Sequence, residues 1–172
     1  MNDFNDLINK HGKEVAGDQL VIKAKATKKS SQIRAYGMIP TRLWMGHLVP
    51  AFSTLSAFAR LLYLYLLSAP TANMAGLYYL NWNAVPSEVG LELEQTITAR
   101  EELVNAGLIS YDTSSKEVWI RDYIQLQVSD EPLNQNDKRM IGLQRTIQQA
   151  RSVSLRQRCL EELELIQGMS IS

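Results

Sequence analysis

The side chains of this chain that could do chemistry are basic rather than catalytic. Between residues 138 and 158, six lysines and arginines occur with no Asp or Glu among them. Positive charge without a counter-charge leaves room for an anionic partner, although such a run is also typical of a solvated helix face. We treat as candidate nucleic-acid contacts Lys138, Arg139, Arg145, Arg151, Arg156 and Arg158.

A second basic segment lies near the N-terminus. Residues 1–44 hold eight Lys/Arg against four Asp/Glu, a net charge of +4, whereas residues 45–128 hold four against eight, a net charge of −4. A flexible basic arm can contact phosphates without reading sequence, and a solvated tail is the alternative. The candidate contacts in this segment are Lys25, Lys28, Lys29 and Arg34.

Patterns typical of enzymes are missing from the sequence. The two histidines, His11 and His47, stand apart, and no Cys or His group has the spacing of a zinc site. No glycine-rich phosphate loop occurs. The single cysteine, Cys159, falls on an apolar helical stripe and fits a reducing compartment. We therefore expect a noncatalytic protein with no metal and no cofactor.

The sequence also predicts a cytoplasmic protein without a membrane contact. Its N-terminus is acidic, unlike the basic start of a signal peptide. The longest apolar run, residues 55–69, is interrupted by Ser56 and Arg60. It is shorter than the ~20 residues that a membrane span needs.

The central part of the chain reads as alternating helices and strands, an α+β fold that is mostly α. Ser53 or Thr54 can cap a buried helix that runs to about Ser68. A helix at 93–106 ends at Gly107, a usual helix stop. The remaining expected elements are a strand at 75–80, a short helix at 83–89, and a hairpin of strands at 108–112 and 117–123.

The helix at 93–106 is the first candidate for reading bases. We expect Leu93, Ile97 and Val104 on its inner face. Its outer face then carries polar and acidic residues, and the acids oppose a phosphate backbone, so a packing or protein-binding helix is the alternative. Its outer residues are Glu94, Gln95, Thr98, Glu101, Glu102 and Asn105, with Arg100 beside them.

Among these, Gln95, Thr98 and Arg100 are the candidate DNA contacts of the helix, because such side chains hydrogen-bond base edges or phosphates. The hairpin adds Lys116 and Arg121. Four aromatic residues could stack on bases or fill the core. They are Tyr78, Tyr79, Trp82 and Trp119.

Two amphipathic helices are expected after a polar linker at 129–136. The first, at 138–150, has one apolar stripe, and the second, at 153–167, has another. Two such stripes need cover from each other, from the core or from a second copy of the chain. We predict self-association, most simply as a dimer, through Leu155, Cys159, Leu163 and Ile166, with an intramolecular hairpin as the alternative.

The division that follows is a basic arm at 1–32, a domain at 33–128, the linker at 129–136 and a helical hairpin or oligomerisation segment at 137–168. Within the domain, the order helix, strand, helix, turn, helix, strand, turn, strand is that of a winged helix-turn-helix. The hairpin at 109–123 would be its wing.

Several motifs in this order resemble the winged-helix domains of phage replication proteins, including replisome organisers and DnaD-type primosome proteins. The resemblance covers about residues 33–127 and depends on the segments 38–44, 75–78, 106–111 and 118–121. It implies DNA binding, to duplex or single strand, and recruitment of a replication protein such as the replicative helicase in a bacterial host cell. It implies no catalytic residues. A winged-helix transcriptional regulator and a phage-encoded inhibitor of a host nucleic-acid machine, using its acidic domain, are the alternatives.

Overall fold

The structure, a computed structural model, describes residues 36–46, 49–129, 131, 133–134 and 136–168. The basic arm predicted at 1–32 and Arg34 lie outside the described residues, together with the candidate contacts Lys25, Lys28 and Lys29. The described residues belong to one compact unit.

The unit is an α+β fold that is mostly α, as the sequence predicts. The expected order of helix, strand, two helices and a hairpin is present in its central part. That part comprises α2 (Ala57–Ser68), β1 (Leu77–Tyr79), α3 (Val85–Val89), α4 (Leu93–Asn105), β2 (Ile109–Asp112) and β3 (Glu117–Ile120). Around it lie the 3₁₀ helices η1 (Thr41–Met45) and η2 (Pro50–Thr54), and α5 (Tyr123–Gln127), α6 (Lys138–Gln148) and α7 (Val153–Gly168). The short helices η1, η2 and α5 were not predicted from the sequence.

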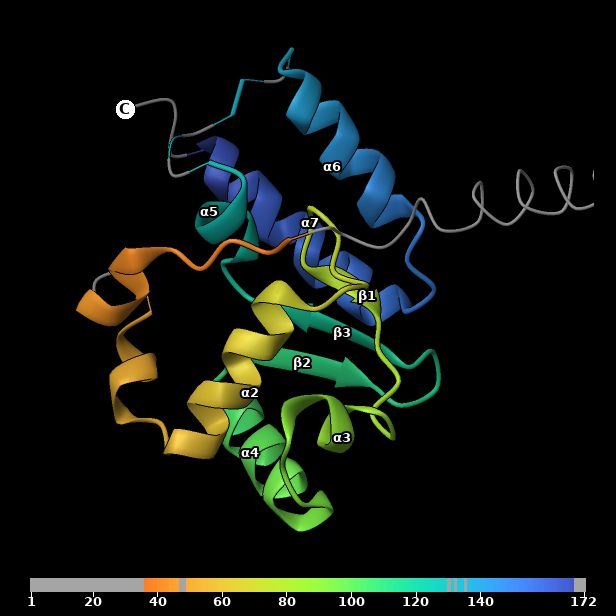
Figure 1. Ribbon diagram of the computed structural model, residues 1–172. Helices are drawn as coiled ribbons and strands as arrows, with labels where there is room; N and C mark the ends of the chain where they lie inside the picture. The colour runs from red at the N-terminus through yellow and green to blue at the C-terminus, as the bar shows by residue number, and fades with distance from the viewer. Residues whose placement is uncertain (1–35, 47–48, 130, 132, 135, 169–172) are drawn as a thin grey trace, which may run out of the picture. The chain divides into compact units, whose positions relative to one another are not determined.

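The three strands form an antiparallel sheet in the order β1-β3-β2. Trp119 in the central strand stands opposite Leu77 on one side and Ser110 on the other. Side chains of a strand alternate between the two faces of its sheet. Every residue of β3 is nevertheless buried, so both faces of the sheet are covered. In Figure 1, α2, α3 and α4 lie on one side of the sheet and α6 and α7 on the other.

The first hydrophobic core lies between α2, α4 and one face of the sheet. Val118 and Ile120 supply the sheet side, and Leu62 and Leu66 of α2 are fully buried against them. The helix begins two or three residues later than predicted, because Ser56, not Ser53 or Thr54, accepts the hydrogen bond of its first turn. The hydroxyls of Ser53 and Thr54 are donated to carbonyls within η2 instead.

The second core lies on the opposite face of the sheet and holds the C-terminal helices. Leu77 and Trp119 face it from the strands, and Ile124 faces it from α5. From α6 come Met140, Leu143 and Ile147, all buried. The α7 stripe that we expected to self-associate is buried here, inside its own chain: Leu155, Cys159, Leu163 and Ile166.

That burial removes the physical basis for a dimer through this stripe. The prediction assumed that the apolar face of α7 had to be covered by another copy, but the sheet and α6 cover it. The apolar faces of α6 and α7 are therefore covered by each other and by the core, which was the alternative to a dimer. Leu133, within the segment predicted as a linker, is also buried in this cluster.

None of the helices in the described ranges combines the length and the apolar character needed to cross a membrane.

Candidate nucleic-acid interface

The loop between β2 and β3 is joined to the start of α7 by a buried glutamate. The carboxylate of Glu117 accepts hydrogen bonds from the backbone N–H groups of Arg151, at 3.0 Å from each oxygen, and of Ser152, at 2.7 Å. A negative charge at a helix N-terminus is favoured by the helix dipole. Lys116 precedes this glutamate in the loop. These hydrogen bonds connect the two backbone segments that carry the exposed basic residues Lys116 and Arg151. We call this buried contact the Glu117 junction.

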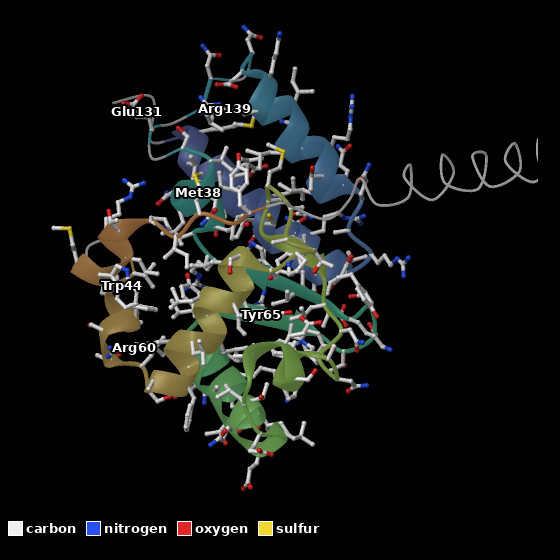
Figure 2. The ribbon with its side chains drawn as sticks, viewed as in Figure 1. Met38, Trp44, Arg60, Tyr65, Glu131 and Arg139 are labelled. Carbon is white, nitrogen blue, oxygen red and sulfur yellow. The ribbon has the colours of Figure 1, made fainter. Side chains whose placement is uncertain are left out.

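Half of the six basic residues at 138–158 are engaged within the chain. Arg139, at the first turn of α6 and labelled in Figure 2, pairs with Asp137 at 2.8 Å, and its guanidinium holds the pKa of that carboxyl below its usual value. Arg156 donates to the carbonyl of Ala150 at 3.5 Å. Arg158 reaches across to the Ser110 hydroxyl on β2, at 3.0 Å.

The other three, Lys138, Arg145 and Arg151, are exposed. Within the described part of the chain, none of their side chains takes part in a hydrogen bond or ion pair. Arg145 stands in the last turn of α6, where the helix dipole also favours a cation. Arg145, Arg151 and the β2–β3 residue Lys116 are all exposed, so a phosphate backbone can reach them. We call Lys116, Arg145 and Arg151 the basic surface.

On α4, two of the residues expected to face DNA, Gln95 and Glu102, instead form hydrogen bonds within the chain. Glu92 and Gln95 form a capping box at the start of the helix, and the Gln95 oxygen accepts from the Glu92 N–H at 3.0 Å. Glu102 accepts from both the N–H and the hydroxyl of Ser56, at 2.7 and 2.6 Å. These bonds lower the pKa of the Glu102 carboxyl. Thr98 remains exposed.

The predicted inner face of α4 is wrong. Leu93, Ile97 and Val104 are exposed, at 63, 38 and 44%. The buried residues are instead Thr96, Ala99 and Leu103. Thr96 can be buried because its hydroxyl donates to the Glu92 carbonyl at 3.0 Å. The helix therefore presents an apolar stripe to solvent beside its acidic residues Glu94 and Glu101, which are exposed as well.

Most of the aromatic side chains that could stack on bases pack against other residues of the chain instead. Tyr78 and Trp119 are buried, one in each core. Trp82 is in edge contact with Tyr111, with ring centroids 5.3 Å apart, and the Arg100 guanidinium lies 5.3 Å from the Trp82 ring centre. Arg100 thus makes a cation–π contact within the chain. Tyr79, in contrast, is 48% exposed on β1.

A pocket of about 610 Å³ lies between α7 and the end of β3, and sequence reasoning did not identify it. The predicted site residue Arg121 lies in its wall with Arg158, so these two are brought together. The full lining is Trp119, Arg121, Asp122, Arg158, Glu161, Glu162 and Leu165.

Buried polar groups make this pocket electrostatically unusual. One oxygen of Glu162 accepts from the Asp122 N–H at 3.1 Å, and the other is buried with no hydrogen-bond partner among the described residues. Burial, above all, raises the pKa of Glu162 to about 7. Burial also raises the pKa of Asp122. The neighbouring Cys159 thiol, likewise buried, has its pKa raised to about 12, so it is no nucleophile at neutral pH.

Exposed apolar side chains gather along residues 36–45, a segment that entered the sequence-based predictions only as part of the resemblance and not as a binding surface. Met38 and Trp44 are 56 and 60% exposed, and both are labelled in Figure 2. Tyr36, Ile39 and Met45 are exposed as well. The density of methionine and aromatic residues was the available signal, since such residues are frequent at protein-binding surfaces.

Among the described residues, no group of three or more His, Cys, Asp or Glu side chains is arranged to hold a metal ion. No protein-family model, curated protein or solved structure matches the chain.

Proposed function

We propose that residues 36–127 form a winged-helix domain and that the chain is a noncatalytic DNA-binding accessory protein of phage-type DNA replication. The fold supports this through the order α2, β1, α3, α4, β2, β3 and the strand order β1-β3-β2, in which α3 and α4 take the place of the helix-turn-helix. The observation that carries DNA binding is the basic surface. Its three charges are exposed, and the Glu117 junction links the segments bearing Lys116 and Arg151.

On this proposal DNA contacts the β2–β3 loop and the α6–α7 turn, not α4. Affinity for DNA comes largely from neutralised phosphates, and the accessible charges of α4 include Glu94 and Glu101. Arg100, the cation on that helix, is held against Trp82. The α6–α7 side has accessible arginines and, over residues 138–158, no acidic residue.

The test is the salt dependence of DNA binding. Fluorescence anisotropy with a random duplex and a random single strand would be recorded over a range of salt concentrations. The variant Lys116→Asn/Arg145→Ala/Arg151→Ala should lower the slope of log affinity against log salt by roughly 2, because each lost phosphate contact removes about 0.7–0.9. Asn is chosen at Lys116 because that residue has φ 56°, a conformation that Asn tolerates.

The matched control is Thr98→Ala/Asn105→Ala on α4, which should leave the affinity for random DNA nearly unchanged. Gln95 is left intact, because its side chain caps α4. Large effects from the α4 variant with small effects from the basic-surface variant would reverse the proposal and place α4 in a groove of DNA.

A second candidate function is protein binding by the acidic helix, as an adaptor for a replication protein or an inhibitor of a host nucleic-acid machine. The exposed apolar stripe of α4 beside Glu94 and Glu101 favours it, since apolar surface rimmed by polar residues marks protein interfaces. If the full chain binds neither duplex nor single-stranded DNA at low salt, this function replaces the first.

A further inference from the structure

Two helices on opposite sides of the sheet carry the same pattern of exposed residues with opposite charge. On α4, Glu94, Ile97 and Glu101 follow one another at positions i, i+3 and i+7. Residues so spaced share one face of a helix. All three are exposed, and Ile97 is 38% accessible. We call this the acidic stripe.

On α6, the same spacing places Lys138, Ile141 and Arg145 on one face. All three are exposed, and Ile141 is 51% accessible. We call this the basic stripe. The buried residues of α6 lie on its other face, which packs into the second core. Each stripe therefore consists of one exposed isoleucine between two charges of a single sign.

We propose that the acidic stripe of one copy of the chain docks on the basic stripe of a second copy. In a parallel alignment of the two helices, each glutamate meets a cation at the same spacing and the two isoleucines meet between them. Opposite charges that face one another across an interface set its register and exclude wrong partners. Within the described part of the chain, none of the four charges is engaged in an ion pair.

The two stripes cannot meet within one copy, because α4 packs on the face of the sheet that holds Val118 and Ile120, whereas α6 packs on the face that holds Trp119. Figure 1 shows the two helices on opposite sides of the sheet. A contact between different surfaces of two copies leaves one free stripe at each end. The association is therefore head-to-tail and continues to a third copy, unlike the symmetric dimer expected from the sequence.

The contact is small, one helix on one helix, below the ~800 Å² per partner of a stable complex. We therefore expect weak, transient assembly that requires a high protein concentration. Arg145 also belongs to the basic surface, so a second copy and DNA compete for it. The inference does not depend on DNA binding, since it concerns how the chain contacts itself.

The test is light scattering on the full chain, a 19.4 kDa monomer, at increasing concentration. At low salt the average mass should exceed that of the monomer and keep rising. It should fall back as salt is raised to roughly 0.5 M, where charges are screened within a few ångströms. The variants Glu94→Lys/Glu101→Lys and Lys138→Glu/Arg145→Glu should each remain monomeric. All four positions are exposed, and circular dichroism checks that both variants are folded.

The decisive measurement is an equimolar mixture of these two variants. Each reversed stripe finds its complement on the other variant, so mixing should restore association that neither shows alone. The control Glu161→Lys/Glu164→Lys makes the same charge change on α7 and should associate as the wild type does. A wild type that stays monomeric at low salt overturns the proposal, as does a folded pair of variants that associate singly or fail to associate when mixed. Retained DNA binding by Glu94→Lys/Glu101→Lys would separate this result from the proposed function.

Discussion

The carboxyl group of Glu162 gives a direct way to test how α7 is docked. It lies on α7 and accepts a hydrogen bond from the Asp122 N–H, just after β3, while its second oxygen is buried without a partner among the described residues. Burial raises the pKa of Tyr63 of α2, and the nearby charges of Asp122 and Glu162 raise it further. The substitution Glu162→Gln keeps an acceptor for the Asp122 N–H and removes the buried charge.

The magnitude follows from the two states of the proton. In the unfolded chain Glu162 has the ordinary pKa of 4.5, and in the folded protein its pKa is about 7. Between these pH values the folded state binds one more proton than the unfolded state, so the free energy of unfolding falls as pH rises, and the loss is complete above about pH 7. At about 1.4 kcal/mol per pH unit this loss reaches roughly 3 kcal/mol. We expect about 2–3, because the side chain is only partly buried.

The assay is urea denaturation of wild type and Glu162→Gln at pH values from about 5 to 8, followed by circular dichroism. The difference between the two proteins cancels every other titrating group. We expect Glu162→Gln to gain about 2–3 kcal/mol relative to wild type over this range. The control Glu164→Gln, an exposed neighbour on the same helix, should show no such pH-dependent gain. A difference between wild type and Glu162→Gln that stays constant from pH 5 to 8 would refute the raised pKa and the desolvation that causes it.

Three further predictions concern the two cores. Leu62→Ala should cost about 2–5 kcal/mol of unfolding free energy, because the fully buried side chain leaves a cavity; a cost below about 1 in urea denaturation would show that α2 is not central. Gly76→Ala should cost roughly 2–6 kcal/mol, since its φ is +65° and the new Cβ would lie 2.3 Å from Cγ of Tyr123. Its control, Gly90→Ala, has φ +78° and open space, so it should cost only about 1–2; equal urea midpoints for the two would contradict the clash. Glu117→Gln should cost about 1–3 kcal/mol, because the buried acceptor of two N–H groups loses its charge. Hydrogen exchange should then quicken first at the start of α7, and uniform quickening would argue against a local cap.

The order of the elements was predictable because it depends on local signals. Periodic apolar residues, Gly107 after α4 and the turn-forming residues between β2 and β3 indicated helices and strands close to their observed bounds. The Cys159 stripe was correctly recognised as apolar, but it was assigned to a second copy, whereas it is buried in the second core of its own chain. Short elements were missed: α5, for example, is only five residues long, and so few residues give too little periodicity to recognise.

The faces of α4 were misread because helical spacing does not say which of two stripes faces the core. Leu93, Ile97 and Val104 are more apolar than Thr96, yet Thr96 is buried. Its hydroxyl is satisfied by the backbone of its own helix, so burial costs little. The side chain of Gln95 was likewise assigned to DNA, although the helix start uses it as a cap.

The sequence by itself determined the amphipathic character of α6 and α7, the acid-free stretch at 138–158 and the two stripes of matching spacing on α4 and α6, because these depend only on residue type and helical period. Only the tertiary structure decided what covers the apolar faces. It placed α7 against Trp119 and α6, which buried the stripe expected to bind a second copy. The same packing withdrew Glu162 from water and tied Glu117 to the start of α7. Hydrophobic attraction has no direction, so an apolar stripe requires cover without specifying its partner, and the partner is set by which surfaces the folded chain brings within reach.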